Sequence, residues 1–345
     1  GGSPGPIRDR PEVSPWGRLS SIDCRRAPWE TGAQFQLRAG KVKPETVTSA
    51  TAPQPLRIRA AVPIIVAGTV LLAFSPILVR LSEVGPIATG VNRMLLPLPV
   101  FFAWMYLQPA QRFPLSAPGG LRGLRIALIS GAFFAGDLMC WHWSIKLTSV
   151  ANATVLANLA PVFVVLGAWV VFREKVNRVF VIGLAIAVSG VAVLMSESLT
   201  ISAATLLGDT LGLVTSWFYA GYILSVSRAR RAMPTVATMA WGGAMASLIL
   251  YVIAFAWEGN VWPDTARGWM VAFALAGITQ ILGQTLIALA LAHVPAEFGA
   301  MILLVQPAIA AVLAWALFGE VLSGLQAMGG VAILAGLYIS RRSTS

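Results

Sequence analysis

The chain alternates between long apolar stretches and short polar ones from about residue 60 to residue 340. A helix needs about 20 mostly apolar residues to cross a lipid bilayer, and ten stretches approach or exceed that length. They cover residues 60–80, 86–106, 123–145, 149–172, 179–196, 203–227, 234–256, 268–292, 295–318 and 322–340. The linkers carry Pro, Gly, Arg or Ser, which commonly mark the ends of helices. The pattern predicts an all-α membrane protein with ten transmembrane helices.

The positively charged residues of the linkers predict an orientation for these helices. If the N-terminus is cytoplasmic, 13 Arg and Lys residues fall in cytoplasmic segments and 3 in segments on the other side. Cytoplasmic loops of membrane proteins carry an excess of Lys and Arg, so both termini are expected in the cytoplasm. An odd number of spans would scramble this bias, and the charges therefore support ten spans. The expected location is the cell membrane, the inner membrane of a bacterium.

Composition agrees with a bilayer and argues against other classes. Hydrophobic residues make up 57% of the chain and charged residues 11%, against about 25% charged in an ordinary soluble domain. The net charge of +11 lies in short loops rather than on one amphipathic element, so nucleic-acid binding is not expected. The two cysteines, Cys24 and Cys140, lie far apart, so no disulfide framework or metal cluster follows, and with only two histidines, His142 and His293, a His-based metal site is not expected. No cofactor and no metal are expected.

Residues 1–55 differ from the rest of the chain. They are polar, rich in Pro, Ser, Arg and Gly, and have no apolar core of the kind that a secretory signal peptide needs. We expect a disordered basic tail here. Because the chain begins with Gly1, it stays open whether this tail belongs to the native mature chain.

An internal repeat appears when the sequence is shifted by 146 residues against itself. The matched pairs are Gly131 with Gly277, Pro161 with Pro307, Trp169 with Trp315, Phe172 with Phe318, Glu174 with Glu320, Gly183 with Gly329 and Gly190 with Gly336. The repeats would cover residues 56–197 and 198–345, with five helices each. Because five is odd, the second copy must enter the membrane from the opposite side. Two inverted repeats with a substrate site between them are typical of secondary transporters.

The repeated motifs resemble the drug/metabolite transporter superfamily and, within it, the EamA-type families. The first copy reads Ser149-Val-Ala-Asn-Ala-Thr-Val-Leu-Ala-Asn-Leu-Ala-Pro161 and continues to Phe172-Arg-Glu174. The second reads Pro295-Ala-Glu-Phe-Gly-Ala-Met-Ile-Leu-Leu-Val-Gln-Pro307 and continues to Leu317-Phe-Gly-Glu320. The resemblance implies ten helices, two inverted five-helix repeats and the export or exchange of metabolites, without naming a substrate. Arg173 stands where the second copy has Gly319, so the two turns need not behave alike.

Two charged residues lie within predicted spans and need a reason to be there. A charge at the bilayer centre costs roughly 2.5–3.5 kcal/mol on insertion scales. Asp137, in the middle of the third span, would bind a substrate amine or a proton, or form a structural ion pair with Arg93 of the second span. If both residues face a cavity, the site would suit a zwitterion such as an amino acid.

Further polar and aromatic residues share helix faces and are candidates for the lining of a cavity. Asp209, Ser216 and Tyr219 lie on one face of the sixth span, as do Gln280 and Gln284 on one face of the eighth. The full set of substrate-site candidates is Arg93, Asp137, Trp141, His142, Asn158, Ser216, Trp217, Tyr219, Gln280, Gln284 and Gln306. His142 is either a proton relay or an interfacial histidine. Small and amide side chains also pack helices together in lipid, which is the alternative for the neutral residues.

Four further residues predict features of the helix backbone and the helix ends. Pro161 and Pro307 each remove a backbone hydrogen bond, so each predicts a kink near the middle of the membrane. Glu174 and Glu320 end two helices at opposite surfaces, where each would either contact a gate or bond to a neighbouring helix end.

These features together predict a secondary transporter that exports or exchanges a small metabolite, amino-acid-like or drug-like, by alternating access. The expected partners are a small-molecule substrate and the bilayer; proton coupling, a homodimer and the transport direction stay open. A non-transporting regulatory or scaffold protein on the same fold is the main alternative. An intramembrane enzyme and a channel are weaker ones, since the sequence has no HExxH, GxSxG or Asp-rich motif and no filter-like Gly-rich segment.

Overall fold

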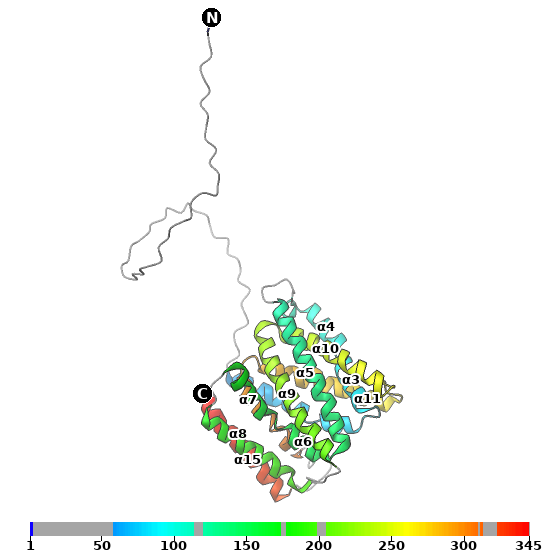
Figure 1. Ribbon diagram of the computed structural model, residues 1–345, viewed down its shortest axis with the longest axis vertical. Coiled ribbons are helices and arrows are strands. Elements are labelled where there is room, and N and C mark those ends of the chain that lie inside the picture. The colour runs from blue at the N-terminus through cyan, green and yellow to red at the C-terminus, as the bar shows by residue number, and fades with distance from the viewer. Residues whose placement is uncertain are drawn as a thin grey trace, which may run out of the picture. The chain divides into compact units, whose positions relative to one another are not determined.

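The structure is a computed structural model, and its regular elements are helices (Figure 1). It describes residues 1–2, 58–113, 120–173, 177–198, 205–309, 311–312 and 323–344. Residues 54–345 form one compact unit, which contains all of these helices. The predicted tail, apart from its first two residues, lies outside the described residues.

The first half of the chain contains α1 to α8. The bounds are α1 (Ile58–Leu72), α2 (Ser75–Arg80), α3 (Pro86–Leu95), α4 (Leu98–Leu107), the 3₁₀ turn η1 (Pro109–Gln111), α5 (Gly120–Leu147), α6 (Val150–Ala157), α7 (Ala160–Phe172), α8 (Arg178–Met195) and the 3₁₀ turn η2 (Ser196–Ser198). Ser149 caps α6 by accepting a hydrogen bond from the Asn152 N–H at 3.0 Å, which separates the closely spaced third and fourth spans.

The second half contains α9 to α15 among the described residues. The bounds are α9 (Leu206–Ala232), α10 (Thr235–Trp257), α11 (Ala266–Ala274), the π-helix η4 (Leu275–Gln284), α12 (Thr285–Ala290), α13 (Ala296–Leu303) and α15 (Gly324–Thr344). Pro295 lies directly before α13, which begins one residue after the predicted start of this span.

Seven helical segments among the described residues are long and apolar enough to cross a membrane, which confirms the prediction of a multi-pass helical membrane protein. They are Ala60–Arg80, Pro86–Leu107, Gly120–Leu147, Asn152–Val171, Arg178–Met195, Thr235–Trp257 and Ala266–Ala290. A shorter apolar helix covers Ala296–Ile309.

Several of these segments are interrupted, and a proline stands at or directly after each interruption. The breaks lie between α1 and α2, α3 and α4, and α6 and α7, and after α13, next to Pro76, Pro97, Pro161 and Pro307. Proline cannot donate the backbone hydrogen bond that a continuing helix needs, and its ring clashes with the preceding turn. The helix is thus interrupted immediately before both Pro161 and Pro307, where kinks are predicted.

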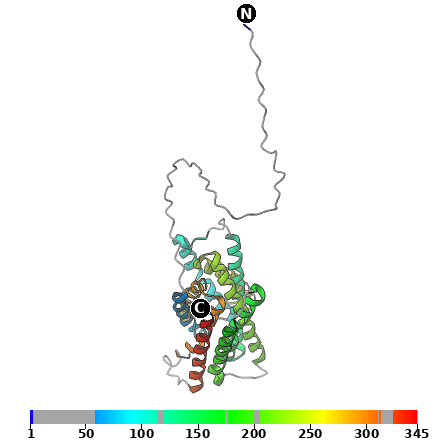
Figure 2. The ribbon, with the colours of Figure 1, turned by 90° about the vertical axis from the view of Figure 1, so that its left-hand side faces the viewer.

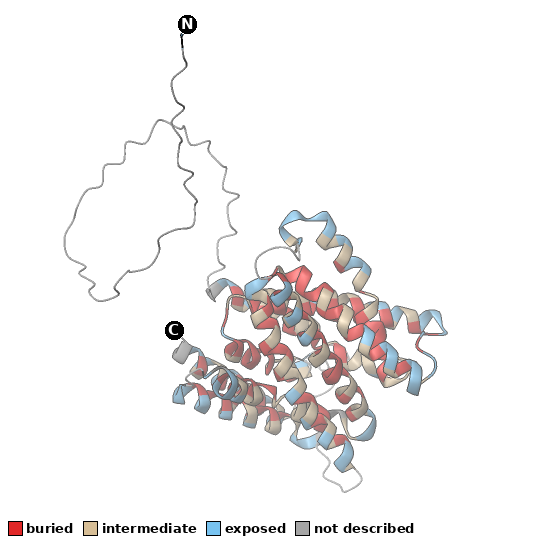
Figure 3. Ribbon diagram, turned by 45° about the horizontal axis from the view of Figure 1, so that its top comes forward, coloured by how far each residue is buried: buried red, intermediate tan, exposed pale blue. Residues whose placement is uncertain are grey.

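The helices pack in a bundle whose apolar side chains also cover its outside. α5 packs along α9 and α10, while α8 packs along α15 at one side of the bundle (Figures 1 and 2). Buried residues follow the inner faces of the helices, and exposed residues follow the outer faces and ends (Figure 3). Large apolar side chains such as Val171 (67% exposed) and Phe255 (66% exposed) lie on the outer faces. Lipid tails would cover such faces in a membrane, where water would not.

Candidate functional site

A cavity of about 90 Å³ lies inside the bundle and has room for several water molecules. We call it the central cavity. Seven of the predicted site residues line it: Arg93, Asp137, Trp141, Asn158, Tyr219, Gln284 and Gln306. Side chains that the sequence pattern did not single out complete the wall, among them Ser75, Phe134, Thr154 and Thr215.

The central cavity lies where the helices are interrupted. Ser75 and Pro76 follow the break between α1 and α2, Asn158 lies between α6 and α7, and Gln306 follows the break after α13. Gln284 ends the π-helix η4, and π-helical turns occur often at functional sites. Gln306 donates from Nε2 to the Leu72 carbonyl oxygen at 3.3 Å, in the turn where α1 ends. Irregular backbone at membrane depth is tolerated where it lines a cavity, as it does here.

Arg93 supplies the positive charge of the central cavity. It belongs to the last turn of α3, and its side chain is only 3% exposed. One guanidinium nitrogen donates to the Ser75 hydroxyl at 2.9 Å, and the guanidinium carbon lies 5.6 Å from the centroid of the Phe134 ring. The Nε atom is buried and has no hydrogen-bond partner within the described part of the chain. The guanidinium therefore keeps donor capacity for an anionic group.

Asp137 supplies the negative charge. It lies in the middle of α5 and is 7% exposed, at the wall of the central cavity. The carboxylate and Arg93 interact electrostatically, yet no ion pair within 4.0 Å joins them among the described residues. No residue of the described part donates a hydrogen bond to Asp137 either. The alternative of a closed structural ion pair between the two residues therefore does not describe this arrangement.

Neutral polar atoms add to the unused hydrogen-bonding capacity of the cavity wall. Thr215 Oγ1 and Gln284 Oε1 are both buried and have no partner within the described residues. An unsatisfied buried polar atom costs about 1–3 kcal/mol, so such atoms normally find partners. Their concentration at one cavity indicates a site that is completed by a ligand or by water.

The other predicted site residues lie elsewhere. His142 is 1% exposed, and its Nδ1 lies 2.7 Å from the Pro86 carbonyl oxygen, where it ties α5 to the start of α3. The Ser216 hydroxyl donates to the Leu213 carbonyl oxygen at 2.7 Å. Trp217 is 53% exposed and packs edge-on against Phe133 on the outside of the bundle. Gln280 lies beside a separate small cavity. Glu174 and Glu320 lie outside the described residues.

Asp209 shares a helix face with Tyr219 but not its surroundings. Its carboxylate accepts hydrogen bonds from the Thr148 hydroxyl at 2.7 Å, the Asn152 amide at 2.9 Å and the Thr205 hydroxyl at 2.9 Å. These bonds join the start of α9 to the turn between α5 and α6. Asp209 therefore holds helix ends together and does not line the central cavity.

A local signal exists for three of the cavity residues that were not predicted. Thr215 lies four residues before Tyr219, Thr154 four before Asn158 and Phe134 three before Asp137, so each shares a helix face with a cavity residue. Ser75 carries no such signal. Among the described residues, no three His, Cys, Asp or Glu side chains gather where they could hold a metal ion.

Comparison with known proteins places this bundle in a family. The family model for the EamA-like transporter family matches twice, over residues 59–196 and 206–342. The pseudopaline exporter CntI of Pseudomonas aeruginosa is 26% identical over 213 residues, which cover 62% of this chain and 73% of CntI. An uncharacterized transporter of Archaeoglobus fulgidus is 23% identical over 277 residues, which cover 78% of this chain and 92% of the relative.

A solved crystal structure has the same fold. It superimposes with a TM-score of 0.68 at 19% sequence identity and covers 84% of this chain and all of its own. The resemblance drawn from the repeated Pro, Trp, Phe and Glu positions is thus confirmed by two separate family matches and by named transporters among the relatives. The chain belongs to the EamA-like transporter family and is a multi-pass membrane transporter.

Proposed function

We propose that this protein is a secondary transporter that exports or exchanges a small zwitterionic, amino-acid-like metabolite by alternating access. The observation that carries the proposal is the central cavity, which the Arg93 guanidinium and the Asp137 carboxylate both line without an ion pair between them. A substrate carboxylate would bind Arg93 and a substrate amine would bind Asp137, and the two charges would neutralise the site together. Trp141 and Phe134 supply apolar surface for the rest of the substrate.

The geometry of α8 and α15 supports two inverted repeats. A Cβ atom added at Gly183 would lie 2.6 Å from the Gly336 carbonyl oxygen, and one added at Gly190 would lie 2.8 Å from that of Gly329. Gly183 and Gly329 are equivalent in the repeat, as are Gly190 and Gly336, so the two contacts exchange under a two-fold operation. Residue numbers rise along α8 while those of the contacted residues fall along α15. Equivalent helices that pack antiparallel fit two copies with opposite orientation in the membrane.

The helices also support ten spans in the proposed domains, 56–197 and 198–345. Besides the seven apolar segments, α9 has 27 residues and α15 has 21, each long enough to cross a bilayer, and Ala296–Ile309 begins a further span. With ten spans, the positive-inside rule favours both termini in the cytoplasm of a bacterial cell. Residues 1–55 would then precede the first span as a cytoplasmic tail.

Relatives support export as the direction of transport, since one of them is named an exporter of pseudopaline. Asp137 is the residue that would couple transport to protons, because one carboxylate can bind either a proton or a substrate amine but not both at once. His142 does not serve as the relay in this proposal, because its Nδ1 is engaged with Pro86 and it does not line the central cavity.

Uptake of labelled amino acids into proteoliposomes loaded with the same compound tests the proposal. We expect saturable counterflow of at least one zwitterionic amino acid, and weaker uptake of its amide and of its N-acetyl derivative, each of which lacks one charge. A pH gradient that changes the uptake would add proton coupling. Folded protein that moves none of the amino acids, or that moves both derivatives as well as the parent compound, would contradict the proposed substrate class.

A further inference from the structure

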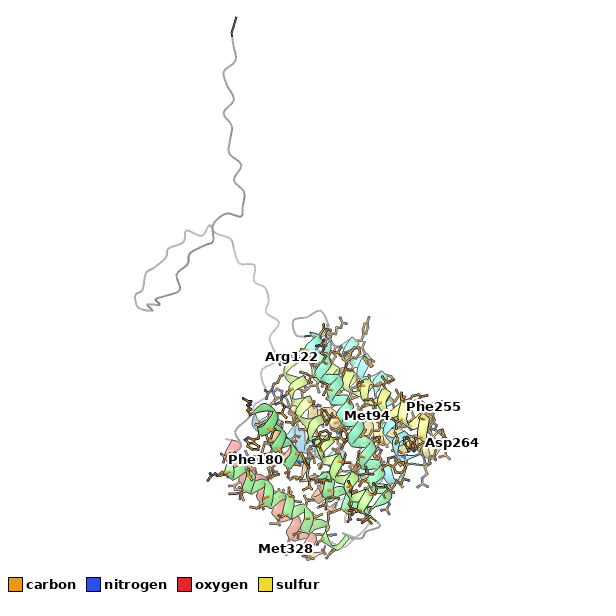
Figure 4. All side chains as sticks on the ribbon, viewed as in Figure 1. Met94, Arg122, Phe180, Phe255, Asp264 and Met328 are labelled. Carbon is orange, nitrogen blue, oxygen red and sulfur yellow. The ribbon has the colours of Figure 1, made fainter. Side chains whose placement is uncertain are left out.

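A second, smaller cavity lies against the central cavity. It has a volume of about 10 Å³, roughly the space of one water molecule, and we call it the side cavity. α3, α5, α9, α10 and η4 all contribute to its wall. Met94 of α3 belongs to this wall and lies in the interior of the bundle (Figure 4). Within the described part of the chain, Phe134 is the one residue that lines both cavities.

The Phe134 ring is held between groups from the two cavities. It stacks on the Tyr222 ring, which lines the side cavity, with centroids 4.3 Å apart and an angle of 20° between the planes. The Arg93 guanidinium of the central cavity lies 5.6 Å from its centroid. The side chain is 2% exposed, so the ring fills the space between the two cavities. Its removal or rotation would join them.

The wall of the side cavity has features of a binding surface. The flexible side chains of Met94 and Met239 can adapt to what enters, while Gly131 and Gly242 let the backbones of α5 and α10 approach closely on one side. Gln280 is 2% exposed, and its Oε1 atom is buried without a hydrogen-bond partner in the described residues. Most buried polar atoms have a hydrogen-bond partner, so an unpartnered acceptor at a cavity wall is a candidate binding group. The acceptor is placed to bind a hydrogen-bond donor that reaches the side cavity.

The repeat gives this pair of residues a common origin in the fold. Phe134 and Gln280 are separated by 146 residues, so they occupy equivalent positions in the two copies. In the first copy this position carries the apolar ring of Phe134, and in the second it carries the amide of Gln280, which can form hydrogen bonds. The two copies therefore contribute side chains of different chemistry, an apolar ring and an amide, to the side cavity.

We infer that Phe134 determines substrate specificity: its ring is a movable partition, and its displacement admits the side chain of a longer substrate to a subsite at Gln280. The inference rests on the proposed function for the identity of the substrate, which would be a zwitterion with a hydrogen-bond donor at the far end of its side chain. The partition itself does not depend on transport and can be measured separately.

Cysteine labelling tests the partition without any substrate. Ser130 lines the side cavity and is 1% exposed, and Ser130→Cys is a conservative change there. In a background of Cys24→Ser and Cys140→Ser, the reaction of this cysteine with 2-aminoethyl methanethiosulfonate would be followed by mass spectrometry. We expect Phe134→Ala to accelerate the labelling at least tenfold, and Phe134→Leu to accelerate it by a smaller factor.

Phe133→Ala is the matched control, because Phe133 is the neighbouring phenylalanine but packs against Trp217 and Phe218 and lines neither cavity. This control is expected to leave the labelling rate unchanged. Only variants that elute as folded protein in size-exclusion chromatography are compared. If Phe134→Ala does not fold, the labelling rate of Phe134→Leu is used in its place. An unchanged labelling rate in a folded Phe134 variant, or equal acceleration by Phe133→Ala, would overturn the partition.

Counterflow with amino acids of increasing length tests the subsite. We expect Phe134→Ala to raise the uptake of long side chains relative to short ones severalfold, and Gln280→Leu to lower the uptake of glutamine relative to norleucine. Unchanged ratios in both variants would overturn the role in specificity. A wild-type protein that moves no amino acid while labelling still accelerates in Phe134→Ala would instead count against the proposed function and leave the partition standing.

Discussion

Asp137 and the carboxylates near the helix starts carry the same kind of charge in opposite surroundings. Glu258 accepts hydrogen bonds from the Ile87 and Ala88 N–H groups at 2.9 and 2.8 Å, at the start of α3. Glu83 accepts bonds from the Asp264 and Thr265 N–H groups at 2.7 and 2.9 Å, before α11 begins. Asp137, in the middle of α5, accepts none from the described residues and has no ion pair with them.

The difference distinguishes carboxylates that stabilise helix starts from the one that we propose binds substrate. The first N–H groups of a helix have no partner within the helix, and its N-terminus favours negative charge, so a carboxylate there stabilises the fold. A carboxylate in the middle of a span has no such donors, and burying it costs free energy. The free energy lost at Asp137 would be regained when a cationic group of the substrate binds. Three kinds of substitution test this contrast.

Among these three, the largest effect is expected from removing the charge of Arg93, the counterpart of Asp137 in the central cavity. Truncating one member of a buried charged contact typically costs about 2–5 kcal/mol, which corresponds to a loss of about 30-fold or more in apparent affinity. We therefore expect Arg93→Gln to lower the counterflow of a zwitterionic amino acid at low concentration by at least about 30-fold. The uptake of its amide, which has no carboxylate for Arg93, should fall much less. Equal losses of uptake for both compounds would show that Arg93 does not bind the substrate carboxylate.

A smaller effect, of opposite sign for the two kinds of carboxylate, is expected in stability. Loss of a side chain that caps a helix start costs about 0.5–2 kcal/mol, so Glu258→Ala should lower the melting temperature of the purified protein. Asp137→Asn removes an unpartnered buried charge and should leave the melting temperature unchanged or raise it. Thermal unfolding of the two variants and the wild type in one detergent measures this. A clear destabilisation by Asp137→Asn would mean that its carboxylate has a structural partner.

The smallest effect is expected in the pH dependence of the stability that Glu83 contributes to the fold. Hydrogen bonds from the Thr265 hydroxyl and N–H groups lower the pKa of Glu83 below its ordinary value of 4.5. A carboxylate with a lowered pKa in the folded state contributes stability above its unfolded pKa, and this is lost as the pH falls through the folded pKa. The difference in melting temperature between the wild type and Glu83→Gln should therefore be largest near neutral pH and shrink below about pH 4.5. A difference that stays constant down to pH 3 would contradict the assignment.

The fold is more predictable from the sequence than the site is, for a physical reason. Hydrophobic length and the positions of Pro and Gly are local properties, so the helical segments and the breaks before Pro161 and Pro307 follow from them. The charges of Arg93 and Asp137 stand out because charge inside a span is costly. These two residues therefore mark the cavity in the amino-acid sequence itself.

Which of the other predicted residues line the central cavity depends on hydrogen-bond partners that are distant in the sequence. Asp209 and Tyr219 share a helix face, yet Asp209 bonds to Thr148 and Asn152, about 60 residues away, and only Tyr219 reaches the central cavity. His142 likewise bonds to Pro86, 56 residues away. Periodicity gives the face of a helix, but it gives neither the neighbour that this face meets nor the hydrogen bonds that it makes there. Phe134 was not predicted because its apolar side chain does not stand out within an apolar span, and only its position three residues before Asp137 marks its helix face.

Two aspartates that differ in their partners offer the most decisive comparison. Counterflow of a zwitterionic amino acid would be measured in proteoliposomes that contain equal amounts of folded wild-type, Asp137→Asn or Asp209→Asn protein. We predict that Asp137→Asn abolishes counterflow, while Asp209→Asn retains most of it in the fraction that folds, because only Asp137 lines the central cavity. Counterflow that survives in Asp137→Asn, or that is lost equally in both variants, would contradict a substrate site at Asp137.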